Sequence, residues 1–356
     1  MHPVSTGTRA PSPRWIAEVV AAATGTAPED IAVERRPGHA SVRSYWRARH
    51  PGGTVMVMVV SPDAPSDEIG KGGPTGPAPF VAVLRYLAGI GVRVPALLAW
   101  SQADGFTVLE DLGDEMMVTR LEAGAPREPL YRAAISQLAA MRVRAAAAPD
   151  PGCVAFQRRY DEDLYRWELD HFVDWMPVRQ GDPGLSSTER AVVDRCFGAI
   201  AARLAAEPEG LTHRDYQSRN IMVLPSGAQA VIDFQDALLG PRAYDLVSLL
   251  RDSYVPLERG FIVQMIRHYL NETAAAGGPE LDPGKFGEIF DLVTIQRKLK
   301  DAGRFVYLDR VKHNPDFLRF VPAALGYVRE AFARLPELRS LQDVLTRHVP
   351  ELGPGT

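Results

Sequence analysis

The spacing of apolar residues changes near residue 115, and this change constrains the fold of the 356-residue chain more than any other feature. Before it, the β-rich runs SVRSYWRAR (41–49) and TVMVMVV (54–60) flank a Pro-Gly-Gly turn, which predicts a hairpin. After it, apolar residues recur mostly with helical spacing as far as residue 348. We therefore expect an α+β protein with a small β-rich first part and a larger, mostly helical second part.

Three further segments define the first part. WIAEVVAAATG (15–25) predicts an amphipathic helix that ends at a glycine, and FVAVLRYLAGIG (80–91) predicts a second one. GFTVLEDLGD (105–114) predicts a strand that leads into an acidic bend. The expected division is a first domain of residues 1–113 and a second domain of residues 114–356.

Composition excludes several classes of protein. No stretch approaches the roughly 20 uninterrupted apolar residues of a spanning helix, and the start, MHPVSTGTRAPSPRW, lacks the apolar core of a signal peptide. Cys153 and Cys196 lie far apart, which argues against a disulfide framework and a CxxC metal site. A net charge of -4 without a basic block argues against nucleic-acid binding. We expect a cytoplasmic monomer that binds neither membranes nor nucleic acid.

The segment HRDYQSRN (213–220) carries the strongest chemical signal, together with Asp233 in VIDF. Phosphoryl transfer needs metal ions that bridge the phosphates and a residue that orients the acceptor hydroxyl. Asp215 has the carboxylate for the orienting role, while Asn220 and Asp233 offer the oxygen ligands that Mg²⁺ prefers. The apolar segment between them contains Pro-Ser-Gly and predicts a hairpin that brings these residues together.

Each of these residues alone has a simpler structural explanation, since an isolated HRD is common and an Asp after a strand usually forms a turn. Their joint spacing has no such explanation. His213 is interpreted as a residue whose ring supports the loop backbone, and Asp245 as a second support from the start of a following helix.

Candidate nucleotide contacts lie in the first part. PGHAS (37–41) is a candidate phosphate-covering turn, with Ser41 as its candidate contact. In LEDLGD, backbone groups of Glu110 and Leu112 are candidates for binding adenine, although a plain interdomain linker would have the same composition. GKGG (70–73) lacks the spacing of a Walker phosphate loop and predicts only a loop.

No lysine occurs in the predicted third strand, where many kinases place the lysine that contacts the ATP phosphates. Arg43 and Arg47 share one face of the preceding strand, so either could supply the missing charge. Both arginines could equally be solvated strand residues. Lys71, the only lysine before residue 285, is the next candidate.

These motifs resemble the aminoglycoside phosphotransferase family of small-molecule kinases, through HRDYQSRN, VIDFQDALLGPRAYDLVSLLRD and LEDLGD. SVRSYWR, ELDHFVDW and IQRKLKDAGRFVYL are similar to segments of its anomeric N-acetylmuramate/N-acetylglucosamine kinases, which serve bacterial cell-wall recycling. The resemblance implies a two-lobed protein-kinase-like fold, with Asp215 as catalytic base and Asn220 and Asp233 as ligands of Mg²⁺. It further implies ATP as phosphoryl donor and a sugar 1-phosphate product for UDP-sugar synthesis.

The helical part must then supply the contacts to an amino sugar. Gln235 and Asp236 follow the predicted metal ligand directly, and Glu168 and Arg297 lie in helical segments of the resembling regions. A solvent-facing helix would explain the last two equally well.

Two alternatives remain open at the level of sequence. Another acceptor, such as an aminoglycoside, choline or homoserine, would use the same machinery. A non-catalytic pseudokinase that binds nucleotide or a partner would explain the missing lysine, but the intact Asp215, Asn220 and Asp233 argue against it.

Overall fold

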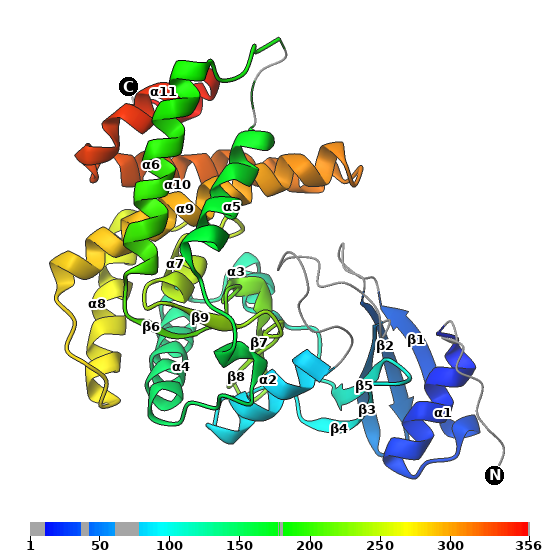
Figure 1. Cartoon of the computed structure of the whole chain (residues 1–356). Helices are drawn as coiled ribbons and strands as arrows, with labels where there is room; N and C mark the ends of the chain where they lie inside the picture. Colours follow the sequence, from blue (N-terminus) through cyan, green and yellow to red (C-terminus); the bar gives the residue numbers. More distant parts are fainter. Residues whose placement is uncertain (1–10, 37–42, 61–77, 177, 179–180, 355–356) are drawn as a thin grey trace. The chain divides into compact units, whose positions relative to one another are not determined.

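The computed structural model describes residues 11–36, 43–60, 78–176, 178 and 181–354. The chain divides into two compact units (Figure 1). Unit 1 comprises Met1–Glu115, Asp150–Ala155 and Met222–Ala237. Unit 2 comprises Met116–Pro149, Phe156–Ile221 and Leu238–Thr356. The boundary expected between residues 113 and 114 stays a prediction.

Unit 1 contains a five-stranded antiparallel sheet of order β1-β2-β3-β5-β4 and the helices α1 and α2. The strands are β1 (Ala32–Arg36), β2 (Ser44–His50), β3 (Gly53–Val59), β4 (Leu97–Ser101) and β5 (Phe106–Glu110). The helices are α1 (Pro13–Thr24), α2 (Ala78–Gly89) and the short 3-10 helices η1 (Pro28–Asp30) and η2 (Val154–Phe156), the last shared with unit 2. Both predicted helices and the predicted hairpin are confirmed.

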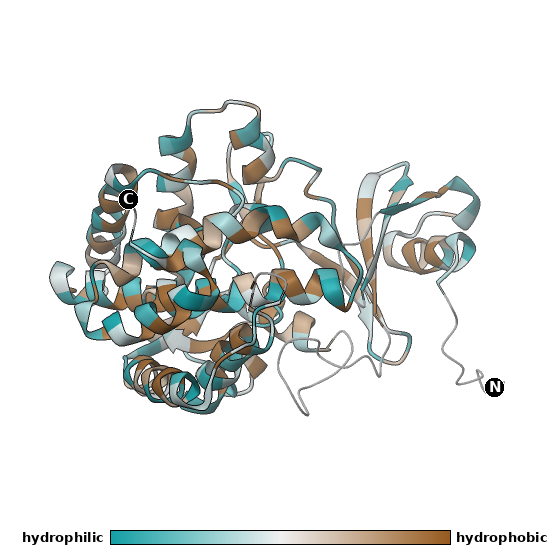
Figure 2. Ribbon diagram, turned by 90° about the horizontal axis from the view of Figure 1, so that it is seen from above, coloured by the Kyte–Doolittle hydropathy of each residue, from teal (hydrophilic) through white to brown (hydrophobic). Residues whose placement is uncertain are grey.

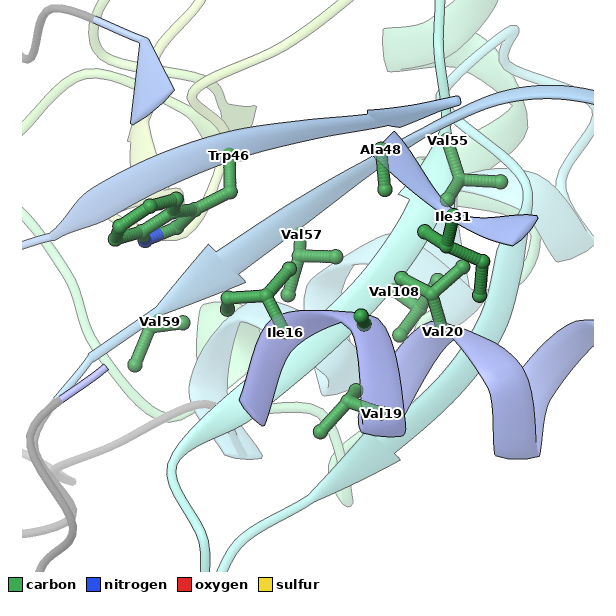
Figure 3. Close-up of a cluster of buried hydrophobic side chains, with 11 residues drawn as sticks. Ile16, Val19, Val20, Ile31, Trp46, Ala48, Val55, Val57, Val59 and Val108 are labelled. Atoms are coloured by element: carbon green, nitrogen blue, oxygen red, sulfur yellow. The ribbon is translucent and has the colours of Figure 1, made fainter. Parts of the chain in front are cut away.

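Helix α1 covers one face of this sheet, and Figure 3 shows its apolar side chains directed at the strands. Ile16 and Val20 are fully buried and pack in one cluster with Val57 and Val108. The hydroxyl of Ser12 accepts a hydrogen bond from a backbone N–H of the first turn, as expected of an N-cap residue. Gly25 ends the helix with φ 71°, a conformation that glycine adopts without steric cost.

Unit 2 is mostly helical, and its helices carry both hydrophobic and hydrophilic residues along their length (Figure 2). The helices are α3 (Met117–Glu122), α4 (Arg127–Ala147), α5 (Glu162–Asp174), α6 (Ser187–Ala205), α7 (Tyr244–Leu250), α8 (Arg259–Ala275), α9 (Pro283–Arg310), α10 (Val321–Phe332) and α11 (Arg339–His348). The 3-10 helices are η3 (Ser218–Asn220), η4 (Pro315–Phe320), η5 (Pro336–Leu338) and η6 (Pro350–Leu352). Among the described residues, no helix combines the length and the apolar character that crossing a membrane requires.

Helix α9 is the centre of unit 2 and packs against α5, α6, α7 and α10. It begins with Asp282 as N-cap, whose carboxylate accepts the Lys285 N–H at 2.7 Å. Its middle part, IQRKL, is buried although three of these five residues are polar. Burying polar groups is costly unless they are hydrogen-bonded, so this segment needs partners within the unit.

Two further sheets have two strands each. The strands β7 (Ile221–Val223) and β8 (Gln229–Val231) pair with each other, which confirms the predicted β insert. A further pair, β6 (Glu209–Thr212) with β9 (Leu238–Pro241), was not predicted from the sequence. β6 leads directly into the HRD segment, and β9 leads into α7.

Candidate active site

The HRD segment follows β6, and Asp245 in the first turn of α7 holds its backbone. The Asp245 carboxylate accepts the backbone N–H groups of His213 at 2.8 Å and of Arg214 at 3.0 Å. The side chain of Asp245 is fully buried, so the two bonds form away from water. The His213 ring accepts the Asp215 N–H through Nδ1 at 3.3 Å. The predicted supporting roles of Asp245 and His213 are therefore confirmed.

Arg214 has φ 74°, one of three positive values among the described non-glycine residues. Such a backbone costs about 1–3 kcal/mol and persists only where its surroundings impose it. The surroundings here are a buried network: Arg214 Nη2 donates to Glu168 at 2.9 Å, and Nε donates to the Tyr160 hydroxyl at 3.0 Å. Gln296 Nε2 donates to the second oxygen of Glu168 at 2.7 Å. Glu168 is thus fully buried and bonded inside unit 2.

Arg297 connects α9 to Asp215. Its Nη2 donates to the Asp215 carboxylate at 2.8 Å, and its Nη1 donates to the Arg214 carbonyl at 2.7 Å and to the Tyr244 hydroxyl at 3.1 Å. Arg297 is buried, while 22% of the Asp215 side chain stays exposed. Burial raises the pKa of Asp215, but the charges of Arg297, Lys300 and Arg214 lower it by more, so the pKa lies below its ordinary value. Asp215 is therefore a partly accessible carboxylate that resists protonation.

Asn220 ends η3 and turns back toward the loop. Its Nδ2 donates to the Asp215 carbonyl at 2.9 Å, and its backbone N–H donates to the Gln217 carbonyl at 2.8 Å. An amide nitrogen cannot bind a cation, so ligation of a cation by Asn220 would use its amide oxygen. Asp215 and Asn220 are thus brought together on one loop of unit 2.

Asp233 belongs to unit 1 and also has an unusual backbone, with φ 64°. Gln235 Nε2 donates to the carboxylates of Asp233 at 2.9 Å and of Asp236 at 3.1 Å. Nη1 of Arg43 lies 3.9 Å from Asp233 Oδ1. Burial raises the pKa of Tyr45 to about 12, with the Asp233 charge as the next cause. Arg43, Asp233, Gln235 and Asp236 therefore form one group within unit 1.

Arg47 is held by a different pair of carboxylates. Its guanidinium lies 2.7 Å from Asp111 and 2.7 Å from Asp114, both in the bend after β5. Nη2 also donates to the Gly113 carbonyl at 3.2 Å. The two arginines therefore differ, since Arg43 points toward Asp233 and Arg47 fixes the acidic bend to β2.

The predicted adenine-binding segment lies at this bend. The Glu110 N–H donates to the Ala96 carbonyl at 2.8 Å, and the Glu110 carboxylate forms an ion pair with Arg93. The hydrogen bond from Arg93 is the largest of the effects that lower the pKa of Glu110. Leu112 is buried. Ser41 and Lys71 lie outside the described residues.

Sequence reasoning missed two supporting residues. Asp252 accepts the backbone N–H of Ser218 at 3.0 Å and that of Tyr254 at 3.0 Å, and it is fully buried. Asp111 holds Arg47. Asp252 occurs at the end of the quoted motif VIDFQDALLGPRAYDLVSLLRD, but nothing in its spacing distinguishes it from a surface residue of a helix end.

Residues 32–283 match the Phosphotransferase enzyme family. The chain belongs to this family. The N-acetylmuramate/N-acetylglucosamine kinase of Pseudomonas aeruginosa is 33% identical over 308 residues, which cover 86% of this chain and 85% of that protein. The protein of the same name from Neisseria meningitidis serogroup B is 32% identical over 319 residues, with coverages of 87% and 88%. The resemblance inferred from the motifs is thereby confirmed.

Solved structures of phosphotransferases have the same fold. Choline kinase LicA from Streptococcus pneumoniae has a TM-score of 0.58 at 14% identity and covers 91% of this chain and 98% of its own. The ADP-bound aminoglycoside phosphotransferase APH(2'')-Ib has a TM-score of 0.55 at 14% identity, with coverages of 89% and 98%. The predicted protein-kinase-like α+β fold is confirmed. The family match ends at residue 283, so Arg297 lies beyond it.

Proposed function

We propose that this phosphotransferase is an ATP-dependent kinase that phosphorylates the anomeric hydroxyl of N-acetylmuramic acid, N-acetylglucosamine or both. The product would be a sugar 1-phosphate that feeds UDP-sugar synthesis in cell-wall recycling. Support comes from relatives of that name, which are about one third identical over most of the chain. The observation that carries the chemistry is the Asp215 carboxylate, held by Arg297 at 2.8 Å on the same loop as Asn220.

Asp215 is assigned to the orientation of the acceptor hydroxyl and the acceptance of its proton. A carboxylate with a lowered pKa is a weak base, so it accepts the proton only when transfer of the phosphoryl group is well advanced. Such a base is best suited to a relatively acidic hydroxyl, and the anomeric hydroxyl is the most acidic one of a free sugar. The charge state of Asp215 thus agrees with anomeric transfer.

Asn220 and Asp233 are proposed as ligands of Mg²⁺. One amide oxygen and one carboxylate with 41% of its side chain exposed form an oxygen donor set that suits this ion. Bound Mg²⁺ would neutralise charge on the phosphates during transfer. In the sequence, the paired strands β7 and β8 lie between Asn220 and Asp233. The chain therefore turns back between the two proposed ligands, which supports the assignment.

ATP is proposed to bind through backbone groups after β5 and through Arg43. Since the Glu110 N–H is already bonded to Ala96, the Glu110 carbonyl and the Leu112 N–H are the groups assigned to adenine. Arg43 is preferred over Arg47 for the phosphates because Arg47 forms ion pairs with Asp111 and Asp114. Ser41 keeps its predicted phosphate role.

The acceptor contacts are revised by the observed burial. Asp236 and Gln235 remain candidates for sugar hydroxyls. Glu168 and Arg297 are proposed as positioning residues, because each is buried and bonded to the HRD segment. Domains of residues 1–113 and 114–356, a monomeric state and a cytoplasmic location complete the proposal.

A panel of acceptors tests this function. ATP consumption would be measured with N-acetylmuramic acid, N-acetylglucosamine, the methyl glycoside of the latter, choline and an aminoglycoside. We expect turnover with the free amino sugars and none with the methyl glycoside, together with a product that has lost its reducing end and hydrolyses in mild acid. Comparable turnover of the methyl glycoside would exclude anomeric transfer. Preference for choline or the aminoglycoside would replace the proposed acceptor, and nucleotide binding without any turnover would indicate a pseudokinase.

A further inference from the structure

Arg219, the residue before the proposed magnesium ligand Asn220, lies over an aromatic pair in unit 2. Its guanidinium carbon is 3.6 Å from the ring centroid of Tyr254 and 5.4 Å from that of Phe320. The two rings meet edge to face, with centroids 4.6 Å apart. We call Arg219, Tyr254 and Phe320 the Arg219 patch. A stacked guanidinium keeps its N–H groups at the edge, where they remain able to donate.

The other two arginines around Asp215 form hydrogen bonds within unit 2. Arg214 donates to Glu168 and Tyr160, and Arg297 donates to Asp215 and to neighbouring oxygens. Within the described part of the chain, Arg219 instead has only its ring contacts, with no hydrogen bond and no ion pair. The Arg219 side chain is half-buried, so part of it remains accessible to solvent or to a ligand.

The patch is held in a fixed position relative to the HRD segment. Asp252 accepts the Tyr254 N–H through one oxygen at 3.0 Å. Its other oxygen accepts the N–H and the hydroxyl of Ser218, at 3.0 and 2.5 Å. One buried carboxylate therefore holds both the residue before Arg219 and the backbone of Tyr254, whose ring contacts Arg219.

The patch also lies within the electrostatic field of the reacting carboxylate. Burial raises the pKa of the Tyr254 hydroxyl most, Arg219 lowers it, and the charges of Asp252, Asp301 and Asp215 raise it. Asp215 and Arg219 both act on this one hydroxyl. Arg219 follows Asp215 by four residues on the same loop, so an acceptor whose hydroxyl meets Asp215 binds in the same part of unit 2 as the patch.

We propose that Arg219 binds the carboxylate of an acidic acceptor sugar while Tyr254 and Phe320 contact the apolar part of the sugar. This inference rests on the proposed kinase function and assigns its specificity. N-acetylmuramic acid differs from N-acetylglucosamine by a lactyl ether that carries a carboxylate. A planar arginine binds a carboxylate through two parallel hydrogen bonds, so Arg219 would favour the acidic sugar.

The test compares both sugars in the parent and in Arg219→Gln. We expect kcat/KM for N-acetylmuramic acid to fall by about tenfold or more relative to kcat/KM for N-acetylglucosamine, the range of a charged hydrogen bond. The loss should appear in the KM of the acidic sugar. Arg219→Lys keeps the charge but lacks the paired donors, so it should lie between the parent and Arg219→Gln.

Arg319→Gln is the matched control, because Arg319 lies 4.9 Å from the same Phe320 ring and the change removes the same charge. If Arg319→Gln lowered the preference for N-acetylmuramic acid over N-acetylglucosamine as much as Arg219→Gln does, the assignment to Arg219 would be overturned. Equal losses for the two sugars in Arg219→Gln would do the same and would indicate a role in phosphoryl transfer.

Equilibrium binding of each sugar separates this inference from the kinase proposal itself. In calorimetry with a non-hydrolysable ATP analogue present, the parent should bind N-acetylmuramic acid more tightly than Arg219→Gln does. Equal affinities of parent and variant would overturn the inference even if the parent turns the sugar over. If the parent bound N-acetylmuramic acid more tightly than Arg219→Gln but consumed no ATP, the inference would stand and the kinase function would be rejected.

Discussion

At the scale of the residue, Asp215 combines partial exposure with a charge that its surroundings maintain. Asp215→Asn keeps the shape of the side chain but removes the proton acceptor. We expect kcat to fall by about 100-fold to 10,000-fold, the usual contribution of a general base, with little change in ATP affinity. Steady-state kinetics and nucleotide titration would measure the two effects. Near-parental turnover in Asp215→Asn would show that another group has this role.

Arg297 sets the pH range over which Asp215 is ionised. Because the folded-state pKa of Asp215 is lowered, the ionised form and the stability it contributes are present above the unfolded pKa and are lost as the pH falls through the folded value. Arg297→Met removes the charge and leaves the burial, which raises the pKa. The acidic limb of kcat against pH should therefore move to higher pH.

Arg297→Lys is the control for this prediction, since it keeps the positive charge at the same position on α9. It should retain most of the parental acidic limb, although its kcat falls because the bonds to Arg214 and Tyr244 are lost. Identical acidic limbs in the parent and in Arg297→Met would mean that Asp215 does not limit the rate at low pH.

The two strand arginines should respond differently to removal. Arg43→Ala should raise the KM for ATP by about tenfold or more and the sugar KM by less, because a charged contact to phosphate is lost. Arg47→Ala instead leaves the buried Asp111 without its partner and should lower the free energy of unfolding by about 3 kcal/mol. Chemical denaturation and ATP kinetics on both variants would distinguish these outcomes. Unchanged ATP kinetics in Arg43→Ala would shift attention to Lys71.

Much of the candidate site was predictable from residue types and spacing, but its geometry was not. The pattern from His213 to Asp233 predicted a carboxylate, an amide and a second carboxylate, the groups that phosphoryl transfer requires, and their catalytic and metal-binding roles stay predictions. The positive φ values of Arg214 and Asp233 carry no signal of their own in sequence, since both residue types usually occupy ordinary backbone regions. The bond from Arg297 to Asp215 joins residues 82 positions apart, and periodicity cannot report such a contact.

At the scale of the element, α5 and α9 are joined through Glu168. Glu168→Gln removes a buried negative charge and leaves Arg214 uncompensated, so the free energy of unfolding should fall by about 3–5 kcal/mol. Denaturant unfolding would measure it. If Glu168 contacted the sugar instead, the main effect would be a raised sugar KM at nearly parental stability.

The helices and the hairpin were predictable because their apolar residues repeat with clear periods. β6 and β9 were missed for a physical reason, since each has only four residues and β9 contains Gly-Pro, which usually marks a turn. The tertiary environment of the HRD segment, rather than local propensity, accounts for this pair.

At the scale of the whole molecule, nucleotide binding should be visible as stability. A ligand present at 100 times its Kd stabilises the native state by about 2.7 kcal/mol. Mg²⁺ with ATP should raise the Tm more than ATP alone, and Asp233→Ala should remove that difference because a charged ligand is lost. Thermal unfolding with and without Mg²⁺ would measure it. The same Mg²⁺-dependent increase in variant and parent would refute the assignment of Asp233.

The position of Arg297 has a consequence for how such enzymes diverge. Its helix α9 begins at the last residue of the family match and forms the packing centre of unit 2, yet through Arg297 it also lowers the pKa of Asp215. Under the proposed function, mutations that repack this helix would alter catalytic speed without touching any signature residue.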